Sequence, residues 1–226
     1  EGMVILDPDT AMNPHSLKAA LRAAGAVVHA VEAVVEGKIK NAFCNVRPPG
    51  HHAERARAMG FCIFNNAAVG AAHALSMGLS RVAICDFDVH HGNGTEDIFR
   101  DEPRVLLCST FQHPFYPFKG ADTRSAHIVN VPLPAGTGSE GFREAVKEHW
   151  LPALEAFRPE MLLFSAGFDA HRDDPLAGLS LVEEDYAWVT EAILPFSGKG
   201  AVSTLEGGYN LKALGKSAAA HIRMLL

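Results

Sequence analysis

The stretch VAICDFDVHHGNG, residues 82–94, decides the fold class of this 226-residue chain. Its first residues form a short, continuous apolar run, which is typical of a strand buried on both faces. The run passes directly into carboxylates, imidazoles and glycines, which suit a loop at a strand end. Similar apolar runs occur elsewhere in the chain, at Ala42–Val46, Val105–Ser109, His127–Val131, Met161–Ser165 and Ala201–Leu205.

Helical patterns separate several of these runs. Apolar residues at helical spacing predict helices over residues 14–36 and 65–77. Thr137–Glu140 and Ser180–Glu183 match capping boxes, which would open two further helices. The alternation predicts an α/β fold with one domain, residues 1–226, and a mostly parallel sheet flanked by helices. In such sheets the active site lies at the carboxyl ends of the strands.

Composition excludes several classes of protein. The chain is 48% hydrophobic and 20% charged, so it can bury a core and is not a disordered or fibrous chain. A formal net charge of −6 argues against direct nucleic-acid binding. We expect no membrane association, because no apolar run approaches about 18 residues. The start shows no signal-peptide pattern and the four cysteines form no CxxC pair, so we expect a cytoplasmic, intracellular protein with reduced core thiols.

The loop after residues 82–85 offers a metal site. Side chains two apart on extended backbone point the same way, so Asp86, Asp88 and His90 share one side. A carboxylate and an imidazole at this spacing can chelate one metal ion, although a polar turn is the alternative. Asp169, in SAGFDAH after another apolar run, is a third ligand or a helix N-cap. Two Asp and one His leave an open fourth position, as in catalytic Zn²⁺ sites, and would also admit Fe²⁺ or Co²⁺.

Two further loops carry groups suited to catalysis. His51 and His52 lie in RPPGHHA, where adjacent imidazoles suit proton transfer near neutral pH. They could equally be metal ligands or solvent-facing residues. In LEGGYN, two glycines before Tyr209 permit a tight turn that places its hydroxyl in a cleft. There the hydroxyl could donate a hydrogen bond to a carbonyl oxygen that gains negative charge, while a tyrosine packed on the core is the alternative.

The motifs RPPGHHA, GFCIFNN, DFDVHHGNGT, SAGFDAH and LEGGYN occur together and in order. On these motifs the chain resembles the zinc-dependent histone deacetylase family, and most of all its class II branch and bacterial histone deacetylase-like amidohydrolases. The resemblance runs from about Asp9 to Asn210. It implies metal-dependent hydrolysis of an N-acetyl amide, with acetyl-lysine as the expected substrate and acetate and a free amine as products. An acetylated polyamine or a small acetyl metabolite is the alternative substrate.

The resemblance also implies roles residue by residue. The zinc ligands would be Asp88, His90 and Asp169. The other implied catalytic residues are His51, His52, Asp86, Asn93 and Tyr209. The implied substrate-binding residues are Asp9, Gly60, Phe61 and Tyr116. A structural K⁺ or Na⁺ would lie between Asp86, Asp88, His90, Ser109 and Thr110, partly on main-chain carbonyls.

Two other functions stay open. A binuclear metallohydrolase of the arginase-like kind would need a second set of bridging carboxylates, which Asp86 alone does not supply. A catalytically inactive module that only binds acetyl-lysine is the second, and Tyr209 argues against it. The resemblance further implies family domains that begin before the segment matching residue 1, so we expect a longer natural chain or a partner there. Met3–Leu6 would then be an uncovered apolar segment, which predicts self-association into a homo-oligomer.

Overall fold

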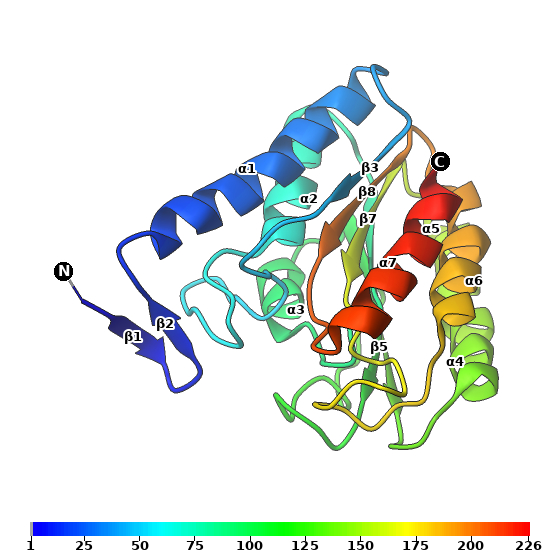
Figure 1. The fold of residues 1–226 in the computed structure, drawn as a ribbon. Coiled ribbons are helices and arrows are strands. Elements are labelled where there is room, and N and C mark those ends of the chain that lie inside the picture. The colour runs from blue at the N-terminus through cyan, green and yellow to red at the C-terminus, as the bar shows by residue number, and fades with distance from the viewer. Residues whose placement is uncertain (1) are drawn as a thin grey trace.

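The protein is described by a computed structural model that covers residues 2–226 (Figure 1). Its centre is a sheet with strand order β3-β8-β7-β4-β5-β6. The strands are β3 (Asn41–Cys44), β4 (Val82–Asp86), β5 (Val105–Gln112), β6 (Ile128–Leu133), β7 (Met161–Ala166) and β8 (Ala201–Leu205). All pairings in this sheet are parallel, so the predicted α/β fold with a mostly parallel sheet is confirmed.

Helices cover both faces of the sheet (Figure 1). On one face lie α1 (Ser16–Val35), α2 (Asn66–Ser76) and α3 (Asn93–Phe99). On the other face lie α4 (Ser139–Ala145), the π-helical turn η1 (Val146–Trp150), α5 (Leu151–Phe157), α6 (Glu183–Ile193), the 3₁₀ turn η2 (Leu194–Phe196) and α7 (Leu211–Leu225). The helices predicted over residues 14–36 and 65–77 therefore correspond to α1 and α2.

Strand β4 shows why its sequence is an unbroken apolar run. Val82 and Ile84 belong to the buried cluster beneath α1 and α2. Ala83 and Cys85 belong to the cluster beneath α4 to α7. Because side chains alternate across the sheet and both faces are covered, every residue of β4 is buried. Beyond Asp86 the chain leaves the strand and enters the loop that carries Asp88 and His90.

The two predicted capping boxes are wrong, although both helices form. At Thr137–Glu140 the threonine hydroxyl donates to the carbonyl oxygen of Pro134 at 2.7 Å instead of capping α4. At Ser180–Glu183 the serine is not the cap either. The Asp185 carboxylate accepts the Val182 N–H at 3.0 Å and so closes the first turn of α6.

An antiparallel hairpin of β1 (Val4–Asp7) and β2 (Thr10–Met12) projects from the sheet, and it was not predicted (Figure 1). Met3 is 70% exposed and Ile5 is 65% exposed, so this apolar segment is uncovered in the single chain. The turn of the hairpin packs back toward the body, where the Asp7 carboxylate lies 2.6 Å from the Arg57 guanidinium. Self-association of this segment stays a prediction.

The four cysteines are all buried and unpaired, as expected for core thiols: Cys44, Cys62, Cys85 and Cys108. Among the helices of residues 2–226, none has both the length and the apolar character needed to cross a membrane.

Candidate active site

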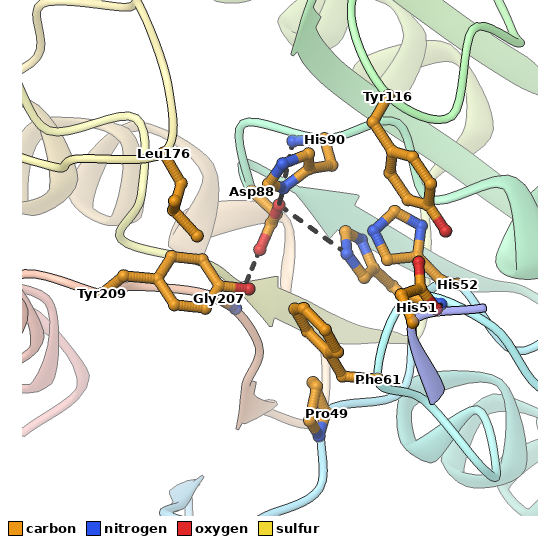
Figure 2. Close-up of a pocket in the computed structure, with 12 residues that line it drawn as sticks. Pro49, His51, His52, Phe61, Asp88, His90, Tyr116, Leu176, Gly207 and Tyr209 are labelled. Atoms are coloured by element: carbon orange, nitrogen blue, oxygen red, sulfur yellow. Dashed lines mark hydrogen bonds and ion pairs between the residues drawn. The ribbon is translucent and has the colours of Figure 1, made fainter. Parts of the chain in front are cut away.

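A pocket of about 250 Å³ opens at the carboxyl ends of the parallel strands (Figure 2). Loops that follow β3, β4, β5, β7 and β8 form its walls, and the turn of the hairpin closes one side. Its lining residues are Asp9, Pro49, His51, His52, Gly60, Phe61, Asp88, His90, Tyr116, Leu176, Gly207 and Tyr209. The lining thus contains residues from four of the five motifs, and Asp169 of the fifth motif, SAGFDAH, contacts the pocket residues Asp88 and His90.

Three side chains in and beneath this pocket form a cluster of metal-binding atoms, here called the donor cluster: Asp88, His90 and Asp169. One ligand atom from each lies within 4.8 Å of the others. His90 Nδ1 lies 3.0 Å from Asp88 Oδ1 and 3.2 Å from Asp169 Oδ2. The far oxygens are anchored by backbone, because Gly207 N–H donates to Asp88 Oδ2 at 2.8 Å and Val89 N–H donates to Asp169 Oδ1 at 2.9 Å. Asp88 Oδ1 also accepts the backbone N–H of His90 at 2.9 Å, so both carboxylates are held beside the His90 ring.

The donor cluster fits a divalent cation. Asp169 Oδ2 is buried and makes no hydrogen bond within residues 2–226. Burial alone would lower the pKa of His90, but the Asp169 and Asp88 carboxylates raise that pKa to about 10. A site that attracts a proton so strongly also attracts a metal ion. A Cβ at Gly207 would overlap the Asp169 carboxylate and lie 2.6 Å from Asp88 Oδ2, so glycine keeps this space open.

The two adjacent histidines have opposite electrostatic surroundings. His51 Nδ1 lies 2.9 Å from Asp86 Oδ2, and its Nε2 lies 3.6 Å from Asp88 Oδ1. Burial opposes protonation of His51, yet these carboxylates hold its pKa well above the ordinary value. His52 Nδ1 instead lies 2.8 Å from the amide oxygen of Asn93. Burial and the neighbouring imidazolium charges lower the pKa of His52 well below the ordinary value, so one ring is cationic and the other neutral.

Tyr209 extends into the pocket on the side opposite His52, with its hydroxyl toward Asp88 (Figure 2). Burial first, and then the carboxylates of the donor cluster, raise the pKa of Tyr209. Its hydroxyl therefore stays protonated and remains available to donate a hydrogen bond. Tyr116 packs edge-on against His52, with ring centroids 5.2 Å apart.

The hairpin turn holds the loop that carries Phe61. Gly60 and Phe61 both have positive φ, at 57° and 66°, and this is an uncommon conformation for phenylalanine. Asp9 Oδ1 accepts the Gly60 N–H at 2.9 Å, and Thr10 Oγ1 accepts the Phe61 N–H at 2.9 Å. Phe61 is thereby fixed at the pocket mouth, edge-on to Tyr209 with ring centroids 6.4 Å apart. Asp9 lines the pocket as well as anchoring this loop.

The residues expected to hold a monovalent cation include Asp88 and His90 of the donor cluster. Asp86 is directly opposite Ser109 in the β4–β5 pairing. Ser109 Oγ is buried and has no hydrogen-bond partner among residues 2–226. Such a hydroxyl fits a cation ligand. The predicted set of Asp86, Asp88, His90, Ser109 and Thr110 is thus compatible with K⁺ or Na⁺, and this ion stays a proposal.

Several residues at the site were not predicted. Pro49 and Leu176 line the pocket but are apolar and lie in loops without a chemical signal. Glu206 Oε2 accepts the N–H groups of Gly50 at 2.6 Å and His51 at 3.1 Å, so it joins the histidine loop to the tyrosine loop. Burial raises the pKa of Glu206 to about 7. Glu206 lies inside the LEGGYN motif, so its carboxylate was a signal that could have been used. The sequence does not show that it binds the N–H groups of Gly50 and His51.

Residues 2–225 match the family model described as the histone deacetylase domain. The chain belongs to the histone deacetylase family. An uncharacterized protein of Synechocystis is 43% identical over 225 residues, which cover 98% of this chain and 73% of that protein. Histone deacetylase 15 of Arabidopsis thaliana is 41% identical over 228 residues, covering 96% of this chain and 41% of the relative. A probable deacetylase of Archaeoglobus fulgidus is 38% identical over 218 residues, covering 92% and 61%.

The crystal structure of the HDA15 HD domain has the same fold as this family member. It aligns with a TM-score of 0.94 at 39% sequence identity, covering 99% of this chain and 68% of that one. The arginase/deacetylase-like architecture is therefore shown. The chain spans less than two thirds of the length of the Arabidopsis and Archaeoglobus relatives.

Proposed function

We propose that this histone deacetylase family member hydrolyses the N-acetyl amide of acetylated lysine, giving acetate and the free amine. The observation that carries the proposal is the convergence of the donor cluster, a neutral His52 and the protonated hydroxyl of Tyr209 on one pocket. The relatives named histone deacetylase and probable deacetylase support the same reaction class.

The donor cluster would hold one divalent cation, with Zn²⁺ favoured and Fe²⁺ or Co²⁺ as alternatives. When bound, that ion supplies Lewis-acid polarisation of the amide carbonyl and of a water molecule. His52 has its Nδ1 engaged by Asn93, so its Nε2 serves as the base that takes a proton from the attacking water. The cationic His51, paired with Asp86, stabilises the negative charge that develops beside it.

Tyr209 donates a hydrogen bond to the carbonyl oxygen as that oxygen becomes negative. One of the two histidines then returns a proton to the departing amine. Along the pocket, Phe61, Tyr116 and Leu176 provide apolar surface for the aliphatic chain of lysine. Each Å² of that chain removed from water contributes roughly 25 cal/mol to substrate binding. An acetylated polyamine presents the same aliphatic chain and acetyl amide, so it is the second candidate substrate.

The decisive experiment is a metal-reconstituted activity screen on acetyl-lysine peptides and acetylpolyamines with Zn²⁺, Fe²⁺ and Co²⁺. We expect release of acetate from one substrate class. Tyr209→Phe should lower kcat by about 10²–10³-fold with little change in KM, because the lost interaction is made only in the transition state. Asp88→Ala should lose the bound metal. No acetate release from any metal-loaded form would instead favour an inactive binding module.

The cellular location of the protein stays a prediction, namely cytoplasmic. Two relatives, at 39% and 40% identity, are named as chloroplastic proteins. Binding of K⁺ or Na⁺ between Asp86, Asp88, His90, Ser109 and Thr110 is part of the proposal. Since Asp86 pairs with His51 at 2.9 Å, that ion would also influence the charge balance of the histidine pair.

A further inference from the structure

Asp174 contacts the loop that carries Tyr209 and belongs to none of the five motifs. The residue is buried, with 7% of its surface exposed. Its Oδ2 accepts the backbone N–H of Tyr209 at 2.7 Å and that of Asn210 at 3.2 Å. Its Oδ1 accepts the N–H of Leu176 at 3.0 Å. One carboxylate therefore holds the backbone of two residues that line the pocket.

The tyrosine loop needs an anchor at this point. Its first half is fixed, because Gly207 N–H donates to Asp88 and the Gly207 carbonyl accepts from Phe168 N–H at 2.8 Å. Gly208 follows with φ of +138°, and glycine leaves the chain free to rotate there. Beyond Gly208, the next two backbone N–H groups both end on Asp174. The direction in which the Tyr209 side chain leaves the loop is thus set by this carboxylate.

We propose that Asp174 is a positioning residue that holds Tyr209 where its hydroxyl reaches the substrate carbonyl, an inference that rests on the proposed function. Hydrogen bonds to an ionised carboxylate are about twice as strong as neutral ones, which suits a role in holding a glycine-flanked loop. Asp174 does not line the pocket, so its contacts with the site run through the backbone of Tyr209 and Leu176, and its charge adds to the effects that raise the pKa of Tyr209. Its neighbour Asp173 meets the tyrosine loop through its backbone carbonyl, which accepts from the Asn210 amide at 2.9 Å, while its exposed carboxylate lies 4.0 Å from His171 Nδ1.

The test is a double-mutant cycle on the metal-loaded full chain with an acetyl-lysine peptide. Asp174→Ala and Asp174→Asn are each made in the wild-type and in the Tyr209→Phe background. Asp173→Asn is the matched control, because its side chain is 61% exposed and lies on the same loop. For each variant kcat, KM and the thermal midpoint are measured.

We expect Asp174→Ala to lower kcat by about 10- to 100-fold, the effect of misplacing a reacting group by up to about 1 Å. Asp174→Asn keeps one oxygen acceptor and should fall between Ala and wild type. In the Tyr209→Phe background both substitutions should change kcat by less than about 2-fold, because the hydroxyl they position is already absent. Asp173→Asn should leave kcat unchanged.

Equal losses of kcat in the two backgrounds would overturn the proposal, since they would show that Asp174 acts on the fold and not through Tyr209. An unchanged kcat in folded Asp174→Asn and Asp174→Ala would overturn it as well. If Asp174→Ala does not fold, the Asp174→Asn cycle alone decides. Failure of the proposed function is distinguishable, because then Tyr209→Phe itself keeps full kcat or no chain releases acetate.

Discussion

Replacing Gly207 by alanine tests the geometry of the donor cluster directly. The new Cβ would overlap the Asp169 carboxylate and would lie 2.6 Å from Asp88 Oδ2. Cβ atoms do not approach other heavy atoms closer than 3.0 Å, so Asp88 Oδ2 has to move by about 0.4 Å. Neither carboxylate can turn away freely, because Gly207 N–H holds Asp88 Oδ2 itself and Val89 N–H holds Asp169 Oδ1.

That displacement exceeds the tolerance of about 0.2 Å for ligand distances in metal sites. We therefore expect Gly207→Ala to lower zinc affinity by at least about 10-fold, the lower end of what disturbed ligand orientation costs. The assay is calorimetric titration of the metal-free chain with Zn²⁺, alongside a thermal melt. Gly215→Ala is the matched control, because no atom lies within 4 Å of a Cβ built there in α7. It should keep its zinc affinity and gain about 0.5–1 kcal/mol of stability.

Equal zinc affinity and stoichiometry in a folded Gly207→Ala chain would refute the reasoning. It would mean that Asp88 and Asp169 do not hold the metal at the position the structure indicates. A loss of affinity in Gly215→Ala of similar size would also count against it, because the effect would then come from the fold and not from the donor cluster.

Three further predictions concern stability and association. Asp185→Ala removes the buried acceptor of Arg143 at 2.8 Å and of the Val182 N–H at 3.0 Å, and should lower the unfolding free energy by about 3 kcal/mol in urea titrations. Burial lowers the pKa of His221 to about 3, so only the unfolded chain takes up this proton between about pH 6.5 and 3. The unfolding free energy should therefore fall as the pH falls through that window. The slope should be up to about 1.4 kcal/mol per pH unit steeper than in His221→Gln, which lacks this group. Urea titrations at pH 7 and pH 5 measure the difference. Ile5→Lys on the exposed hairpin should shift the chain toward monomer in light scattering, and a parent chain that is already monomeric would contradict the predicted self-association.

The strands and the chemistry at their ends could be predicted from sequence because both depend on local signals. An apolar run such as Val82–Cys85 can be satisfied only where both faces are covered, so it identifies a strand of a parallel sheet. Asp88 and His90 follow that run two residues apart, and the assumption of extended backbone predicted that they share one side. In the structure β4 ends at Asp86 and residues 88–90 bend instead, and the Asp88 carboxylate meets the His90 side chain because it also accepts the His90 N–H at 2.9 Å. Their place beside a strand end, and their suitability for a metal, needed no knowledge of the partners.

Other features depend on which strands become neighbours, and no local pattern contains that. Asp169 faces His90 only because β7 pairs with β4, although β5 and β6 separate these strands in the chain. Glu206 reaches the Gly50 N–H across 156 residues for the same reason, since β8 pairs with β3 at the sheet edge.

The predicted capping boxes show the limit of local rules. Ser180–Glu183 matches the pattern, yet the Asp185 carboxylate closes the helix because it also has to meet the Ser139 hydroxyl at 2.7 Å and Arg143 from α4. Asp174 is the same case at the active site, where a carboxylate without a motif meets Tyr209 35 residues away. Periodicity and spacing determine which helix or strand a segment can form. The packing of segments that are distant in the chain decides which hydrogen-bond partners are chosen. The reason is that a buried polar group must bind whichever partner the fold brings to it.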